Sequence, residues 1–173
     1  MTWTNSDGLF IKFAKEEGQV VKGGTYSTLG PLKCTEVKID LTDLAAIDTT
    51  YIMGSDHNNR GIVIPSGARI EKVEVVAETA ATSGGAATLD IGLVRLDRTT
   101  AIDLDGVVAA LALASINADG ELNTLSVGVT SAGALVGTTT ANAGILVAEV
   151  NTAVYTAGKV AVRVYWYNPQ TDG

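Results

Sequence analysis

His57 is the only histidine in the chain and the first residue to consider for catalysis. It lies in a polar stretch, residues 54–60, directly after Ser55 and Asp56. Serine, histidine and aspartate form the catalytic triad of many hydrolases. In a triad each side chain must orient the next, and three consecutive residues of one loop cannot do so. We therefore expect His57 to be an exposed loop histidine.

Cys34 is the only cysteine, so the chain cannot form an internal disulfide. Because no histidine is near it in sequence, we expect a buried structural thiol rather than a nucleophile. One cysteine and one histidine cannot supply the three or four ligands of a zinc site.

Three aspartates, Asp97, Asp103 and Asp105, precede Gly106 and could supply oxygen ligands to Ca²⁺. Their spacing differs from that of an EF-hand loop, and no glutamate closes the set. We favour a turn followed by a helix cap, with a calcium site as the alternative.

The sequence contains none of the motifs Gly-x-x-x-x-Gly-Lys-Ser/Thr, Gly-x-Ser-x-Gly, His-Glu-x-x-His or Cys-x-x-Cys. It therefore lacks a recognisable phosphate loop, hydrolase nucleophile or metal motif. We expect a protein that is not an enzyme and that uses no cofactor and no metal.

The sequence pattern predicts that the secondary structure carrying these residues consists of β-strands. Apolar and polar residues alternate with period two in residues 9–13, 37–41, 73–77, 89–93 and 160–166. Less regular strand candidates are 62–64, 122–127, 134–138 and 145–150. Glycine-rich turns separate them, and Ser83-Gly84-Gly85 predicts a hairpin or a tight turn between sheets. We predict an all-β, antiparallel β-sandwich of about eight strands with at most one or two short helices.

One segment has helical spacing. Leu104, Val107, Val108 and Leu111 follow the i, i+3, i+4, i+7 pattern, and Asp103 or Asp105 could cap the start. This pattern predicts a short helix over residues 106–114, although the alternation of Leu111 and Leu113 would also allow an extended segment.

The aromatic residues gather towards the two ends of the chain. We interpret residues 1–32 as an extended N-terminal arm and residues 33–173 as the sandwich domain. The arm is too apolar for a free tail, and its strand at residues 9–13 could join the sheet edge of a neighbour. In the last strand Trp166 should face the core and the tyrosines should face outward. The predicted interface residues are Trp3, Leu9, Phe10, Phe13, Tyr26, Tyr165 and Tyr167.

Composition and charge exclude several classes of protein. The 173 residues are 46% hydrophobic and only 18% charged, with a formal net charge of −7. An acidic chain of this kind does not suit sequence-independent nucleic-acid binding or docking on anionic lipid. No apolar run reaches the ~18 residues of a spanning helix, and no export signal is visible at the start. We expect a protein made in a cytoplasm, with no nucleic-acid or membrane partner.

Several segments resemble small virion proteins that tailed bacteriophages, in particular marine-type phages, encode beside the major capsid protein. These segments are residues 7–13, 23–26, 30–32, 64–70, 87–93, 103–106 and 155–160. The resemblance implies a jelly-roll-like sandwich that acts as a capsid decoration or cement protein. It also implies a homotrimer on the outer capsid surface, with the major capsid protein as partner. The alternative is a sandwich knob on the virion that binds a carbohydrate or receptor.

Overall fold

The computed structural model describes residues 2–4, 10–12, 25–27, 32–54 and 61–169. Strands make up almost all of its regular structure, joined by two 3-10 helices of three residues, η1 (Leu41–Asp43) and η2 (Leu113–Ser115). The strands are β1 (Thr2–Thr4), β2 (Phe10–Lys12), β3 (Thr25–Ser27), β4 (Lys33–Asp40), β5 (Tyr51–Ile52), β6 (Val63–Ile64), β7 (Arg69–Ser83), β8 (Thr88–Arg95), β9 (Ala101–Ala112), β10 (Leu122–Ser126), β11 (Gly144–Asn151) and β12 (Tyr155–Tyr167).

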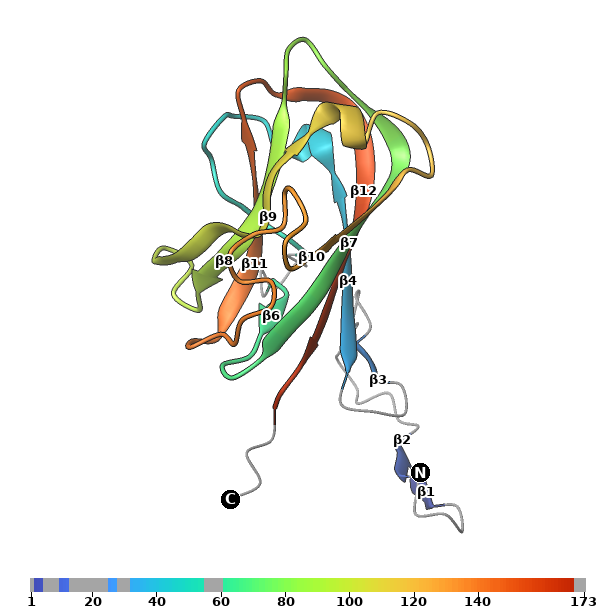
Figure 1. Cartoon of the computed structure of the whole chain (residues 1–173), viewed down its shortest axis with the longest axis vertical. Coiled ribbons are helices and arrows are strands. Elements are labelled where there is room, and N and C mark those ends of the chain that lie inside the picture. The colour runs from blue at the N-terminus through green and yellow to red at the C-terminus, as the bar shows by residue number, and fades with distance from the viewer. Residues whose placement is uncertain (1, 5–9, 13–24, 28–31, 55–60, 170–173) are drawn as a thin grey trace.

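Ten of these strands form two antiparallel sheets that face each other (Figure 1). Sheet I has the order β10-β7-β12-β4-β3. Sheet II has the order β5-β11-β8-β9, with β6 also paired to β11. Strand β4 pairs with β12, β5 with β11, β7 with β10 and β8 with β9, so the chain is one long antiparallel hairpin whose paired strands alternate between the two sheets. This nested winding is that of a jelly roll. The predicted all-β sandwich is confirmed.

The core lies between the sheets and follows from the alternation of side chains. In β7, Val73, Val75 and Ala77 are fully buried, and in β12, Val160, Val162 and Val164 are fully buried. Their neighbours in sequence point to the outer face, as period two requires. Trp166 is 5% exposed and belongs to the same core, as predicted. Branched aliphatic side chains thus build both the strands and the core.

Strand β11 departs from alternation because seven of its eight residues are buried. Leu146 faces the main core, whereas Ile145 and Val147 form a second apolar cluster with Val94 on the outer side of sheet II. Ile52 packs against that cluster. A strand covered on both faces gives a continuous apolar run, which explains its irregular pattern in the sequence.

The predicted helix at residues 106–114 is wrong. Strand β9 continues to Ala112, and only the three residues of η2 follow it as helix. The pairing of β9 with β8 is irregular, with several extra residues on β9, and Ala110 has a φ of 49°. Each β-bulge shifts the phase of the buried positions, so a bulged strand reproduced helical spacing.

Most other predicted elements are present. The turn at residues 83–85 carries the chain from β7 in sheet I to β8 in sheet II, so it joins two sheets. Residues 134–138 do not form a strand; they make turns that pack Val136, 6% exposed, against the core. Within the described ranges no helix is long and apolar enough to cross a bilayer.

The predicted arm contains three short strands. Strand β3 pairs with β4 and is the last strand of sheet I. Strands β1 and β2 pair with each other and form a separate two-stranded sheet. In Figure 1 this pair lies beyond one end of the sandwich.

Candidate protein interface

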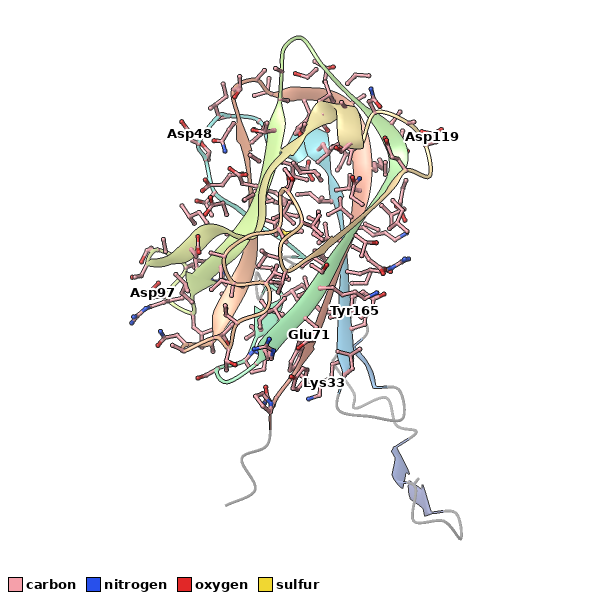
Figure 2. All side chains as sticks on the ribbon, viewed as in Figure 1. Lys33, Asp48, Glu71, Asp97, Asp119 and Tyr165 are labelled. Atoms are coloured by element: carbon pink, nitrogen blue, oxygen red, sulfur yellow. The ribbon has the colours of Figure 1, made fainter. Side chains whose placement is uncertain are left out.

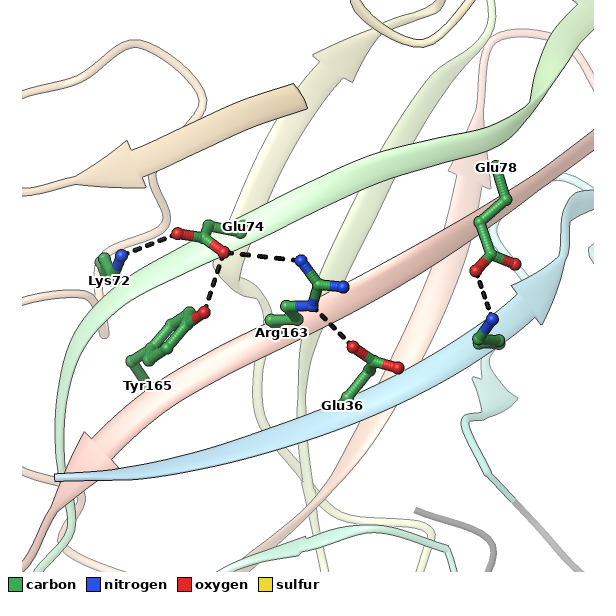
Figure 3. A network of polar contacts seen from close by, with 7 residues as sticks. Glu36, Lys72, Glu74, Glu78, Arg163 and Tyr165 are labelled. Atoms are coloured by element: carbon green, nitrogen blue, oxygen red, sulfur yellow. Dashed lines mark hydrogen bonds and ion pairs between the residues drawn. The ribbon is translucent and has the colours of Figure 1, made fainter. Parts of the chain in front are cut away.

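The outer face of sheet I carries the best-organised set of polar side chains in the described chain. Register places Glu36 of β4 and Glu74 of β7 on either side of Arg163 in β12. The Arg163 Nε donates to Glu36 Oε2 at 2.6 Å, and Arg163 Nη1 lies 4.0 Å from Glu74 Oε2 (Figure 3). One guanidinium thus bridges two carboxylates across three strands.

Two side chains from the neighbouring cross-strand pair, Lys72 and Tyr165, also donate hydrogen bonds to Glu74. Lys72 Nζ donates to Glu74 Oε1 at 2.7 Å, and the Tyr165 hydroxyl donates to Oε2 at 2.9 Å. Partial burial opposes ionisation of Glu74, but these donors outweigh it and lower its pKa. The Lys72 ammonium lies 4.3 Å above the Tyr165 ring, a cation–π contact.

The network continues along the sheet through two further ion pairs. Lys38 pairs with Glu78, and Lys159 Nζ lies 3.4 Å from Asp40 Oδ2. Both pairs are exposed, so screening by water leaves them little effect on stability. We call the outer face of β4, β12 and β7 the charge ladder. It carries the polar side chains described above, with Glu36 near one end and Glu78 near the other. Its main consequence is a polar face whose charges are mutually neutralised.

Two of the tyrosines predicted as interface residues, Tyr165 and Tyr167, fall on this face, and Tyr26 shares a register row with the first of them. Tyr26 of β3 is opposite Cys34, and Cys34 is opposite Tyr165, so these three residues occupy one cross-strand row. Tyr167 lies two residues further along β12, opposite Arg69, and is half-buried. The pairing thus brings Cys34 next to Tyr165, 131 residues away in sequence, and puts Tyr26 in the same row, 139 residues away. Figure 2 shows Tyr165 on the sheet I side and Asp97 on the opposite side of the molecule.

The other predicted interface residues are placed elsewhere. Trp3 lies in β1 opposite Ile11, and Phe10 lies in β2 opposite Thr4. Leu9 and Phe13 fall outside the described residues, as does His57. The structure therefore separates the predicted set into one group on sheet I and one on the β1–β2 pair.

Cys34 is half-buried at the base of the charge ladder, not fully buried as predicted. Burial raises the pKa of its thiol, partly offset by a hydrogen bond with Tyr165. A raised pKa disfavours the thiolate, which agrees with a structural rather than a nucleophilic role.

The outer face of sheet II has a different electrostatic character. Asp90 of β8 is directly opposite Glu149 of β11, and Glu149 is 8% exposed. Burial raises the pKa of Asp90, and the nearby Asp105 and Glu149 charges add to that effect. Donors from the Ala110 backbone and the Asn151 amide act against it. Burial and Asp105 likewise raise the pKa of Asp103.

The two sheets therefore differ in charge. The strands of sheet I carry six cations and five anions, whereas those of sheet II carry Arg95 against four carboxylates, Asp90, Asp103, Asp105 and Glu149. All ion pairs among the described residues join side chains of sheet I. One face of the sandwich is charge-balanced and the other is acidic.

The predicted aspartate cluster is divided by the fold. Asp97 accepts from the Thr99 and Thr100 amides in the β8–β9 turn, which lowers its pKa to about 2. Asp103 and Asp105 lie within β9, so the predicted helix cap is wrong. Among the described residues, no three histidine, cysteine or acidic side chains are arranged to bind a metal.

The charge ladder was not predicted as a site. Alternating charges at residues 36, 38 and 40, and at 72 and 74, do indicate an outward-facing side of two strands. They do not reveal that both strands flank Arg163. That contact depends on strand order and register, which sequence patterns leave open.

No protein-family model matches this sequence, and no curated protein matches it significantly. Solved structures do match, with modest similarity over most of the chain. A chain from the capsid of Ralstonia phage GP4 has a TM-score of 0.54 at 12% identity, covering 86% of this chain and 91% of its own.

Two further matches come from other phages. A chain of the cyanophage Pam1 capsid has a TM-score of 0.51 at 18% identity, covering 92% of this chain and 100% of its own. A chain of the acid-stable capsid of Helicobacter pylori bacteriophage KHP30 has a TM-score of 0.51 at 16% identity, covering 82% and 90%.

This chain shares its fold with chains of three phage capsids. The fold expected from the resemblance to phage virion proteins is therefore confirmed. At 12–18% identity the likeness concerns the arrangement of the strands and does not transfer the role of any residue.

Proposed function

We propose that the chain is a structural virion protein that binds the capsid of a tailed bacteriophage and stabilises it. It acts as a cement or decoration protein that bridges neighbouring subunits of the major capsid protein. The observation that carries this proposal is the fold shared with phage capsid chains over 82–92% of this chain. The absence of a catalytic motif from the sequence agrees with a role that needs no turnover.

The charge ladder is the face that we assign to the shell. Its charges are balanced, and the half-buried Tyr165 and Tyr167 line it. Tyrosine and arginine are enriched in interfaces, and the lysines and carboxylates of this face are paired with one another, which lowers the cost of covering them. The acidic face of sheet II then points away from the shell, on the outer surface of the virion.

A homotrimer fits this role because a repeated lattice rewards several weak contacts at once. Each contact of a trimer raises the effective concentration for the next. A binder that recognises only the assembled shell stabilises it by about 2.7 kcal/mol per site at a hundredfold excess over Kd. Modest contacts from each copy are therefore sufficient.

The test compares particles with and without this protein for resistance to heat and osmotic shock. We expect particles that carry the protein to survive a higher temperature and to contain hundreds of copies of it. Equal resistance of the two particles would contradict the cement role. A low copy number together with measurable sugar binding would support the knob instead.

A matched pair of charge reversals tests which face meets the shell. Lys38→Glu alters the charge ladder, and Arg95→Glu makes the same change in charge on sheet II; both residues are exposed. We expect Lys38→Glu to weaken co-sedimentation with particles at least tenfold and Arg95→Glu to leave it unchanged. The reverse order would assign sheet II to the shell.

A further inference from the structure

The edge strand β9 of sheet II is covered by other parts of the chain, whereas the edge strand β10 of sheet I is not covered by any described residue. The edge of β9 in sheet II is covered by the chain that follows β10. Ala109 donates to the Ser131 carbonyl at 2.9 Å, Gly133 to Val107 at 3.3 Å, and Leu135 to Gly106 at 2.7 Å. Such covering prevents an exposed edge from pairing with another chain.

The β10 edge of sheet I has no such cover among the described residues. The Ala77 amide donates to the Glu121 carbonyl at 2.8 Å, which marks residue 121 as a position hydrogen-bonded to β7. Alternation along the β10–β7 register then directs the backbone groups of residues 123 and 125 towards β7. The amides and carbonyls of Leu122 and Thr124 point away from the sheet, and no described residue bonds to them.

This edge also lacks the usual devices that discourage pairing. Strand β10, with the sequence Leu-Asn-Thr-Leu-Ser, contains no charge and no proline. Leu122 is 56% exposed on its outer face, and Val127, just past its end, is 69% exposed. The edge is therefore suited to the addition of an extended apolar strand.

The β1–β2 pair lacks a third strand to pair with among the described residues of this protein. It consists of two antiparallel strands of three residues, and it is a separate sheet in this protein. An isolated two-stranded ribbon is at best marginally stable in water, and a third strand is the usual remedy.

We propose that the β1–β2 pair of one copy adds to the β10 edge of a second copy, extending sheet I between subunits. The arm enters sheet I at β3, the edge opposite β10. The β1–β2 pair lies on the β3 side of the molecule (Figure 1), away from β10 of its own copy, so we expect it to meet the β10 edge of a second copy. Repeated around a ring of three, this head-to-tail contact closes on itself. The inference rests on the homotrimer in the proposed function and names the surface that forms it.

Cross-linking of two differently labelled chains tests the pairing directly. One full-length chain carries Ile11→Cys and the other Thr124→Cys, both in a Cys34→Ser background. After mixing and treatment with a short bismaleimide, we expect a covalent heterodimer. Val63→Cys, on an exposed position of β6 in sheet II, replaces Thr124→Cys as the control and should give none. The experiment is done free in solution and on particles.

Thr124→Pro tests the edge itself. Because the Thr124 amide does not bond to β7, proline there preserves the internal ladder and removes a donor from the free edge. We expect the proline variant to sediment as a monomer at micromolar concentration and to lose the cross-link at least tenfold. Thr124→Ala, which keeps the amide, should behave as the parent, and thermal unfolding verifies that both variants are folded.

The outcomes separate this inference from the function on which it rests. A cross-link only within one chain, obtained with Ile11→Cys and Thr124→Cys combined, would overturn the exchange. So would no cross-link either in solution or on particles, or a Thr124→Pro variant that stays oligomeric. If particle binding persists while the cross-link is absent, the shell-binding role stands and the arm exchange is wrong. If the parent chain shows neither particle binding nor the cross-link, the proposed function is contradicted as well.

Discussion

Ala110 shows how a single residue accommodates the irregular pairing of β9. Its φ of 49° is left-handed, a conformation that costs an L-residue about 1–2 kcal/mol. In that conformation its amide reaches the Asp90 carboxylate. The strain is thus part of the bulge that links β9 to β8.

Replacing Ala110 by glycine should stabilise the protein. Glycine adopts a positive φ without penalty, although the unfolded chain gains some entropy. We expect a gain of up to about 1 kcal/mol in the free energy of unfolding, or about 2–4 °C in Tm. Ala109→Gly, at a neighbouring position without a positive φ, should instead lose about 0.5–1 kcal/mol. Similar losses from both variants in thermal unfolding would refute the strain at Ala110.

Asp90 predicts a pH dependence of stability. Its pKa is raised in the folded protein, so the folded state binds more protons than the unfolded state from pH ~4 up through the folded pKa. This contribution therefore disfavours folding increasingly as the pH rises through the folded pKa. Glu149 from β11 and Asp105 from β9 are the charges that face it, opposed by the Asn151 amide and the Ala110 backbone amide.

Asp90→Asn should raise Tm at pH 7 and change it little near pH 4. Thermal unfolding between pH 4 and 8 measures the difference. Asp97 acts in a separate window, because its depressed pKa of about 2 means that its contribution is lost only as the pH falls below ~4. A Tm difference for Asp90→Asn that is the same at all pH values would contradict the role assigned to its charge.

At the scale of elements, the contact of β8 with β9 depends on Gly92. A Cβ atom there would overlap the Asp103 carbonyl oxygen and the Leu104 backbone, neither of which is a movable side-chain end. The absence of a side chain lets β9 lie against β8 where their register shifts.

Gly92→Ala should therefore destabilise the sandwich by about 2–3 kcal/mol, the cost of overpacking against fixed backbone. Gly84→Ala is the matched control, because nothing lies within 4 Å of the added atom and its φ is not positive. We expect Gly84→Ala to be neutral or slightly stabilising in denaturant unfolding. Equal effects of the two variants would show that the β8–β9 approach is not close.

At the scale of the whole molecule, the arm and the sandwich should be separable. Residues 1–24 precede β3 and include β1 and β2, which among the described residues pair only with each other. Deleting them should leave Tm of the isolated chain within about 2 °C, while deleting residues 1–32 also removes β3 from sheet I and should lower it. Scanning calorimetry of the two truncations, compared at a concentration where the parent is monomeric, provides the measurement. A large loss of Tm on removing residues 1–24 would mean that the arm supports the sandwich directly.

The sequence by itself determined the class of fold and most of the strands. Val73, Val75 and Ala77, or Val160, Val162 and Val164, have one arrangement that buries them all, because a strand places alternate side chains on one face. These properties are local, so a short window of residues contains them.

Only the tertiary structure decided which strands are neighbours, where the bulges fall and which side chains meet. The spacing of Leu104, Val107, Val108 and Leu111 predicted a helix, yet extra residues in β9 produced the same spacing in a strand. Arg163 lies 127 residues from Glu36, and the row from Tyr26 to Tyr165 joins both ends of the chain. Pairing and register depend on the combined burial of two whole sheets. That is a long-range property, and no local pattern of residue types specifies it.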